Sequence, residues 1–259
     1  MRTLMTLILA LALVFVPSVA LAAPSQAELV QMLKTIDDRQ QNSGDYHSTV
    51  YIEQKEAGKS DLVYQAGVYR QDLNDTLVIL FLKPQAEAGK GYLRVDKNLF
   101  FYDPASGKWE RRTDRERIGG TGSQRQDFDQ STLAIDYVPA YVAEEKLGQY
   151  AVNHLKLTAT ETADVAYPVV ELWLDKGTGN ILKRQDFAIS GKLMRTTYYP
   201  QWQKMYSASK KGDVYFPKEI RIFDEVQKGT STTVVIQEVQ LDPLDSSIFT
   251  KAWLESKSR

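Results

Sequence analysis

Cysteine does not occur among the 259 residues, so the chain forms no disulfide and has no thiol nucleophile. Histidine is scarce: only His47 and His154 occur, and a hydrogen-bonded structural role is the simplest interpretation of His154. A metal site needs at least three clustered ligands, and no G-x-S-x-G motif marks a nucleophilic serine. We therefore expect no catalytic residue, no metal and no cofactor. A hydrolase with two facing carboxylates among the 33 acidic residues is the remaining enzymatic alternative.

The chain also lacks an excess of either charge. Its 32 lysines and arginines oppose 33 aspartates and glutamates, a net charge of −1. This balance provides no overall attraction to nucleic acid or to anionic lipid. We therefore expect no nucleic-acid partner and only transient contact with a membrane.

Long apolar runs are absent after the N-terminus. The run at residues 4–16 follows the basic Arg2 and is too short to span a bilayer. Ala20-Leu21-Ala22, a small-x-small cleavage site, comes next. Residues 1–22 are therefore predicted to be a cleaved secretory signal peptide, with an uncleaved anchor helix as the alternative. We expect a periplasmic protein in which residues 23–259 form one domain, because no repeat or low-complexity linker divides them.

The first predicted element is an amphipathic helix that begins at a capping box. Ser25 is followed three residues later by Glu28, and Leu29, Leu33 and Ile36 then recur at helical spacing. The helix should end near residues 42–44.

After the helix the apolar period changes to two, which predicts strands. Residues 76–83 are apolar on both faces, so this strand should be covered on both sides. Two hairpins are expected, at 90–104 and at 167–189. The other predicted strands are 47–55, 62–71, 150–161, 192–205, 214–225 and 230–241, which brings the total to about eleven.

Residues 113–145 interrupt the strands with a charged, glycine-rich stretch and a short helical piece at 129–138. Five arginines and the GGTG turn between residues 111 and 129 suggest a phosphate site. A phosphate loop, however, ends in Gly-Lys-Ser/Thr, and this stretch lacks that lysine. Interleaved aspartates and glutamates favour a solvated loop instead. Contact with lipid head groups or an acidic partner is the alternative for Arg111, Arg112, Arg115 and Arg117.

Many short strands with few helices predict a mainly β fold: one strongly curved antiparallel sheet whose concave face is covered by helices. Inward side chains of such a sheet either fill a core or line a cavity. The alternating apolar positions that would line a cavity are Tyr64, Val68, Leu80, Leu82, Leu93, Val170, Leu172, Leu174 and Met194.

The order of several soft motifs resembles the bacterial outer-membrane lipoprotein-sorting family, in particular its periplasmic LolA-like branch. The stretches that carry the resemblance lie between residues 100 and 255. They are FFYDPASGKWERR, IGGTGSQRQDFDQSTLAIDY, LMRTTYYPQWQKM, YFPKEIRIFDE and SSIFTKAWLE.

The resemblance implies an eleven-stranded half-barrel that encloses acyl chains and performs no catalysis. Residues 113–145 would then be a lid, with Gly119, Gly120 and Gly122 as its hinge and Arg70 or Arg94 as its latch. The partners would be lipoprotein or lipid acyl chains, an inner-membrane transporter and an outer-membrane acceptor. A periplasmic sensor or adaptor that binds a transporter or a lipoprotein is the alternative function.

Overall fold

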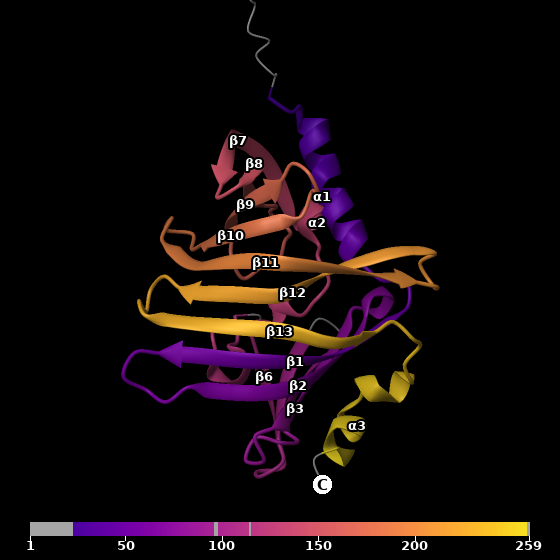
Figure 1. Cartoon of the computed structure of the whole chain (residues 1–259). Coiled ribbons are helices and arrows are strands. Elements are labelled where there is room, and N and C mark those ends of the chain that lie inside the picture. Colours follow the sequence, from indigo (N-terminus) through magenta and orange to yellow (C-terminus); the bar gives the residue numbers. More distant parts are fainter. Residues whose placement is uncertain (1–22, 96–97, 114, 258–259) are drawn as a thin grey trace, which may run out of the picture.

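The computed structural model describes residues 23–95, 98–113 and 115–257, and the predicted signal peptide lies outside these residues. Thirteen antiparallel strands form a single sheet (Figure 1). They are β1 (Asp45–Glu56), β2 (Leu62–Gln71), β3 (Thr76–Lys83), β4 (Gly91–Val95), β5 (Asn98–Asp103), β6 (Lys108–Arg112), β7 (Tyr137–Leu147), β8 (Tyr150–Ala159), β9 (Val169–Asp175), β10 (Ile181–Phe187), β11 (Leu193–Ser207), β12 (Gly212–Asp224) and β13 (Thr230–Gln240). The α-helices are α1 (Gln26–Gln40), α2 (Leu133–Asp136) and α3 (Lys251–Ser256).

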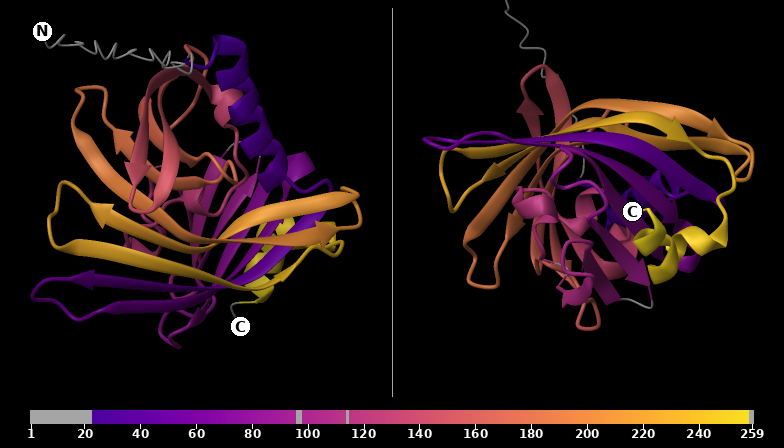
Figure 2. Two further views of the ribbon diagram at one scale, coloured as in Figure 1. Left: turned by 45° about the horizontal axis from the view of Figure 1, so that its top comes forward. Right: turned by 90° about the horizontal axis from the view of Figure 1, so that it is seen from below.

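The sheet is curved and open, and its two edge strands are consecutive in the chain. The strand order is β6-β5-β4-β3-β2-β1-β13-β12-β11-β10-β9-β8-β7, so β6 and β7 lie at opposite edges. Residues 115–136, which we name the connecting segment, cross from one edge to the other over the concave side (Figure 2). We call the face that the connecting segment covers the inner face.

The prediction of one strongly curved antiparallel sheet is confirmed, but three details were wrong. The sheet has thirteen strands rather than about eleven, because β6 and β7 were not predicted as strands. Residues 137–145 were assigned to the interruption and instead belong to β7. As an edge strand, β7 has half-exposed valines and a proline, Pro139, near its start, so its sequence is not easily recognised as a strand. The third helix, α3, was not predicted, and it covers the outer face rather than the concave one.

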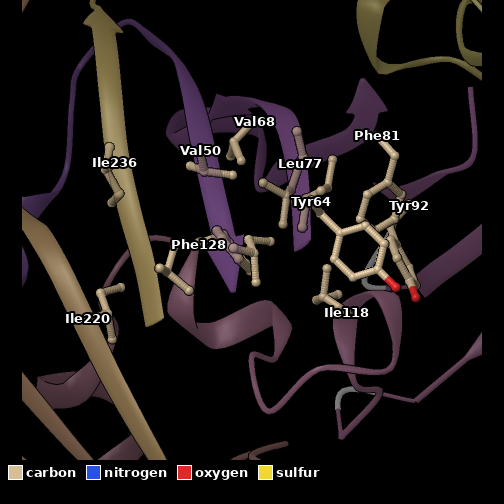
Figure 3. Close-up of a cluster of buried hydrophobic side chains, with 14 of the residues drawn as sticks. Val50, Tyr64, Val68, Leu77, Phe81, Tyr92, Ile118, Phe128, Ile220 and Ile236 are labelled. Carbon is tan, nitrogen blue, oxygen red and sulfur yellow. The ribbon is translucent and has the colours of Figure 1, made fainter. Parts of the chain in front are cut away.

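Three apolar clusters hold the sheet to its covering segments. In the first inner cluster, Ile118 and Phe128 of the connecting segment pack against Val50, Leu77 and Ile220 of the sheet (Figure 3). In the second inner cluster, α1 packs Leu29, Leu33 and Ile36 on β8, β9 and β10. The outer cluster packs Phe249 and Leu254, from the C-terminal turn and α3, against β3, β4 and β5.

Strand β3 is covered on both faces, as its sequence predicts. Leu77, Ile79 and Phe81 point into the first inner cluster, whereas Val78 and Leu80 point into the outer cluster. Side chains alternate along a strand, so a doubly apolar sequence requires two covering layers. The connecting segment supplies one of these layers and α3 supplies the other.

Candidate functional site

The connecting segment is held against the inner face by buried side chains and by hydrogen bonds at its glycines. Ile118 is fully buried, and the Tyr64 hydroxyl donates to the Gly119 carbonyl at 3.0 Å. The Gly122 backbone N–H donates to Thr232 Oγ1 at 2.8 Å. Gly119 and Gly120 have φ angles of 60° and 74°, in the left-handed region that favours glycine. The segment therefore follows a backbone path that other residues would strain.

Buried ion pairs fasten the middle of the connecting segment to β10 and β11. Arg195 Nη2 lies 2.5 Å from Asp127 Oδ1, and Arg195 Nε lies 3.2 Å from Asp186 Oδ2. Arg184 Nε donates to Asp186 Oδ1 at 2.7 Å. Burial works to lower the pKa of the Arg195 guanidinium, but the carboxylates of Asp127 and Asp186 raise it above its ordinary value. Arg195 therefore remains a cation inside the protein.

A second set of arginines fastens the end of the same stretch to the opposite half of the sheet. Arg70 on β2 pairs with Asp72 and donates from Nη1 to the Phe128 carbonyl at 3.2 Å. Arg94 on β4 pairs with Asp75, and its Nη1 lies 4.0 Å from Asp129 Oδ2. Both arginines that the resemblance suggested as a latch therefore contact the connecting segment. The latching role itself stays a prediction.

Asp37 ties helix α1 to α2. Its Oδ1 accepts hydrogen bonds from Ser131 Oγ at 2.6 Å and from the Leu133 N–H at 3.0 Å, and its Oδ2 accepts one from the Ala134 N–H at 2.7 Å. These groups lie at the N-terminal end of α2, where backbone donors have no partner within the helix. Burial raises the pKa of the Asp37 carboxyl despite these hydrogen bonds.

Two of the spaces beside the connecting segment lie between it and β10, β11 and β12. One is an inner pocket of about 140 Å³ between the segment, Trp202 and the sheet. The other, which we name the groove, holds about 460 Å³ between the segment and the ends of β10, β11 and β12. Its apolar lining consists of Ala166, Tyr167, Ala188, Ile189, Met194, Ile222 and Val226. Small-molecule sites typically measure about 300–1,000 Å³; of these two spaces the groove has that size, as does a third space of about 450 Å³ between the segment and Phe81, Tyr92 and Phe101.

The predicted cavity residues fall into different environments. Met194 lines the groove and Val68 lines the inner pocket. Tyr64 is packed in the first inner cluster. The β9 side chains Val170, Leu172 and Leu174 are buried in the second inner cluster, beneath α1. Whether any of them contacts a ligand stays a prediction.

Three of the predicted cavity residues do not face the inner side. Leu80 and Leu93 are buried in the outer cluster, and Leu82 is 41% exposed. Both faces of β3 are apolar, so its alternation indicates two sets of side chains without showing which set points inward. The cavity residues predicted on β3 belong to the set of side chains that points away from the inner face.

The four predicted head-group arginines separate into two pairs. Arg111 and Arg112 lie on β6, where Arg112 pairs with Glu110 and sits 5.4 Å from the Phe101 ring centroid. Arg115 and Arg117, on the connecting segment, line the groove. Their roles, and the hinge role of the three glycines, stay predictions.

Sequence reasoning missed Arg184, Arg195 and Asp186, whose charges meet at the inner face. The available signal was position: each lies within a predicted strand, and an unpaired charge on the covered face of a strand would be costly. Charged residues at such positions indicate buried partners, but the sequence does not identify those partners.

Among residues 23–95, 98–113 and 115–257, no group of three or more acidic, histidine or cysteine side chains is arranged to hold a metal ion.

Within those same ranges, no helix combines the length and the apolar character required to cross a bilayer.

Solved structures with this arrangement define the class of fold. A LolA superfamily protein from Nitrosomonas europaea superposes with a TM-score of 0.74 at 20% identity, over 87% of this chain and 98% of that one. A putative outer membrane lipoprotein-sorting protein domain from Vibrio parahaemolyticus gives 0.76 at 17% identity, over 89% and 100%. A DUF1329 family protein from Desulfovibrio piger gives 0.76 at 16% identity, over 88% and 98%. The chain therefore has the LolA-like fold, and the resemblance seen in the sequence is confirmed at that level.

A family model described as that of an uncharacterized protein matches residues 73–256, which is more than half of the chain. The chain belongs to this family. No curated protein matches it.

Proposed function

We propose that this protein is a non-catalytic periplasmic carrier that binds the acyl chains of a lipoprotein or another lipid at its inner face. The observation that carries the proposal is the groove of about 460 Å³, lined by seven apolar residues beside a segment that crosses the concave face. The LolA-like fold supports it, as does the structural similarity to a putative outer membrane lipoprotein-sorting protein domain.

The physical task of such a carrier is to replace the burial that a membrane provides. Exposing acyl chains to water costs about 0.8 kcal/mol per methylene, so one long chain carries on the order of 12 kcal/mol. Apolar walls such as Met194, Ile222 and Tyr167 recover part of this free energy. The connecting segment and α1 cover much of the remaining concave side, so a full-length chain enters by displacing part of the segment.

Transport between membranes would require a donor and an acceptor for the cargo. We propose an inner-membrane transporter and an outer-membrane acceptor as these partners, with the predicted signal peptide directing the chain to the periplasm. Cargo would be released by return of the connecting segment to the position described above.

The proposal is tested by titrating the purified protein with a fluorescent fatty-acyl probe and displacing it with lipids and lipopeptides. Met194→Asp, which places a charge in the groove, should weaken probe binding by about tenfold or more. Leu82→Asp changes an exposed leucine on the opposite face and should leave binding unchanged. If the wild-type protein takes up no probe and native mass spectrometry finds no co-purified lipid, the carrier function is wrong.

A second candidate function, binding of a protein partner as a sensor or adaptor, is favoured by the edge strand β7. Val138 and Val142 on this strand are 54% and 49% exposed, and edge strands offer unpaired backbone groups to an added strand. Recovery of an envelope protein with this chain, lost on Val142→Lys, together with no bound lipid, would support this alternative.

A further inference from the structure

The mouth of the groove is framed by charged side chains as well as by apolar ones. Arg115 and Arg117 approach from the connecting segment, and Asp224 and Gln227 approach from the turn between β12 and β13. Arg115 is exposed, and no described carboxylate pairs with it. The neighbouring Glu116 is directed to Arg112, with 3.4 Å between Oε1 and Nε. Among the described residues that line the groove, two cations, Arg115 and Arg117, therefore lie at its mouth with one carboxylate, Asp224.

Arg117 is held in position without using all of its donors. Its Nε donates to the Thr121 carbonyl at 2.8 Å, which fixes the guanidinium against its own turn. The two terminal nitrogens make only long contacts, Nη1 to Asp224 Oδ2 at 3.5 Å and Nη2 to Gln54 Oε1 at 3.5 Å. A guanidinium has five donors in a planar fork, so the 40%-exposed Arg117 retains capacity for a further acceptor.

Asp224 is engaged mainly by its own turn. Its Oδ1 accepts the backbone N–H groups of Val226 at 2.9 Å and Gln227 at 2.7 Å. Only Oδ2 is directed to Arg117, and the 3.5 Å separation is longer than that of a strong charge-assisted pair. At the base of the groove, the charge of Arg195 is balanced by Asp127 and Asp186. The uncompensated positive charge therefore lies at the mouth.

Apolar surface without a protein partner lies at the same mouth. Ile189, in the turn between β10 and β11, is 91% exposed, and Val226, in the turn between β12 and β13, is 48% exposed. Both residues line the groove, which continues inward to Met194 and Ile222. An apolar channel with arginines at its entrance matches a molecule that has a hydrocarbon tail and an anionic head.

We propose that the groove binds an anionic amphiphile, with its carboxylate or phosphate ester held by Arg115 and Arg117 and its hydrocarbon tail along Met194 and Ile222. The inference rests on the proposed carrier function and specifies the chemical class of the molecule that is carried. Arginine suits this role because its fork matches carboxylate and phosphate oxygens in a bidentate arrangement, which a neutral head group cannot use.

The test compares amphiphiles with the same tail and different heads. Hexadecanoate, hexadecanol and a sixteen-carbon lysophosphatidate compete with a fluorescent acyl probe on the full-length mature protein, and inorganic phosphate is tested alone. The wild-type protein should bind both anionic amphiphiles about tenfold or more tightly than hexadecanol, the scale of one charge-assisted contact. The Arg115→Gln/Arg117→Gln variant should lose this preference while keeping its affinity for hexadecanol. Arg111→Gln, on the neighbouring β6, should behave as the wild type.

Each result of this comparison is decisive. Preference for hexadecanoate identifies a fatty-acid carboxylate as the head, and preference for the lysophosphatidate identifies a phospholipid phosphate; both support the inference. If all three amphiphiles bind equally well and the double variant does not change their affinities, the inference is overturned, whereas the carrier function is still supported. Displacement of the probe by inorganic phosphate alone as effectively as by the amphiphiles also overturns it. If none of the three amphiphiles and no acyl probe binds, both the carrier function and the inference are wrong.

Discussion

Four buried charged side chains form a network of ion pairs between the connecting segment and the sheet. Arg184, Arg195, Asp127 and Asp186 are almost completely buried, yet each has an oppositely charged partner. Removing charges from water costs several kcal/mol for each ion, and the cost is offset only by close pairing and additional hydrogen bonds. Such a network contributes little net stability, but it selects one position for the connecting segment, since any other position leaves charges unpaired.

Arg195→Met is expected to lower the free energy of unfolding by about 3–5 kcal/mol, because it leaves Asp127 and Asp186 as buried carboxylates without this partner. Arg221→Gln removes an exposed pair with Glu219 and should cost less than about 1 kcal/mol. Urea denaturation of the three proteins gives the comparison. Equal stability of the Arg195 variant and the wild type would show that the network is not closed in solution.

Asp37→Asn should change how stability depends on pH. Burial raises the pKa of Asp37 in the folded protein, so folding binds its proton more tightly. The contribution of this group is therefore fully present below the unfolded pKa of about 3.9 and is lost as the pH rises through the higher folded pKa. The stability advantage of the wild type over the variant should be larger at pH 4 than at pH 7. An advantage that grows with pH would mean that the hydrogen bonds from α2 outweigh burial.

Helix α3 depends on its packing against the sheet. It has six residues, and an isolated helix of that length is not stable in water. Thr250 caps it, since its Oγ1 accepts the Trp253 N–H at 3.2 Å. Leu254 is fully buried beside Leu80 and Leu93. Helix α3 and the outer face of strands β3 and β4 therefore stabilise each other.

Leu254→Ala should destabilise the protein by about 2–5 kcal/mol, the cost of removing a buried leucine side chain. Leu73→Ala is the matched control, because that leucine is 71% exposed and should change stability by about 0.5 kcal/mol or less. Thermal or urea unfolding gives both values. A similar small effect at both positions would mean that α3 does not stay docked.

The protein as a unit consists of one long curved sheet whose two edges are joined by the segment that covers its inner face. The connecting segment contacts β2, β4, β10, β11 and β13 through hydrogen bonds and ion pairs. In the proposed carrier function, displacing the segment to admit a long acyl chain requires these contacts to break together.

A disulfide between the connecting segment and β13 tests this requirement. A β-carbon placed on Gly122 would lie 3.5 Å from Thr232 Cβ, and disulfides join β-carbons about 3.5–4.5 Å apart. The chain has no other cysteine, so Gly122→Cys/Thr232→Cys forms one defined bond. The oxidised variant should bind the acyl probe about tenfold or more weakly than the same variant after reduction. Uptake that is equal in the two states, with the single-cysteine variants as controls, would show that binding proceeds without movement of the segment.

Much of the local structure follows from the order of residues alone. The capping box at Ser25 and Glu28, the two-residue apolar period and the turn residues predict α1 and nearly all of the strands, because these patterns act over a few neighbouring positions. The same patterns indicate one curved sheet and an interruption that joins its parts. They do not identify β7, an edge strand with one face in water, or α3, which is too short for a clear helical period.

Contacts between residues far apart in the sequence decide which face of the sheet is the inner face. They also decide which side chains lie together on that face. Arg195 and Asp127 are 68 positions apart, and no local pattern pairs them. Leu80 and Met194 appear equivalent as alternating apolar residues, yet one packs under α3 and the other lines the groove. Strand alternation gives each side chain one of two faces, but only the path of the whole chain settles which face is covered by which segment.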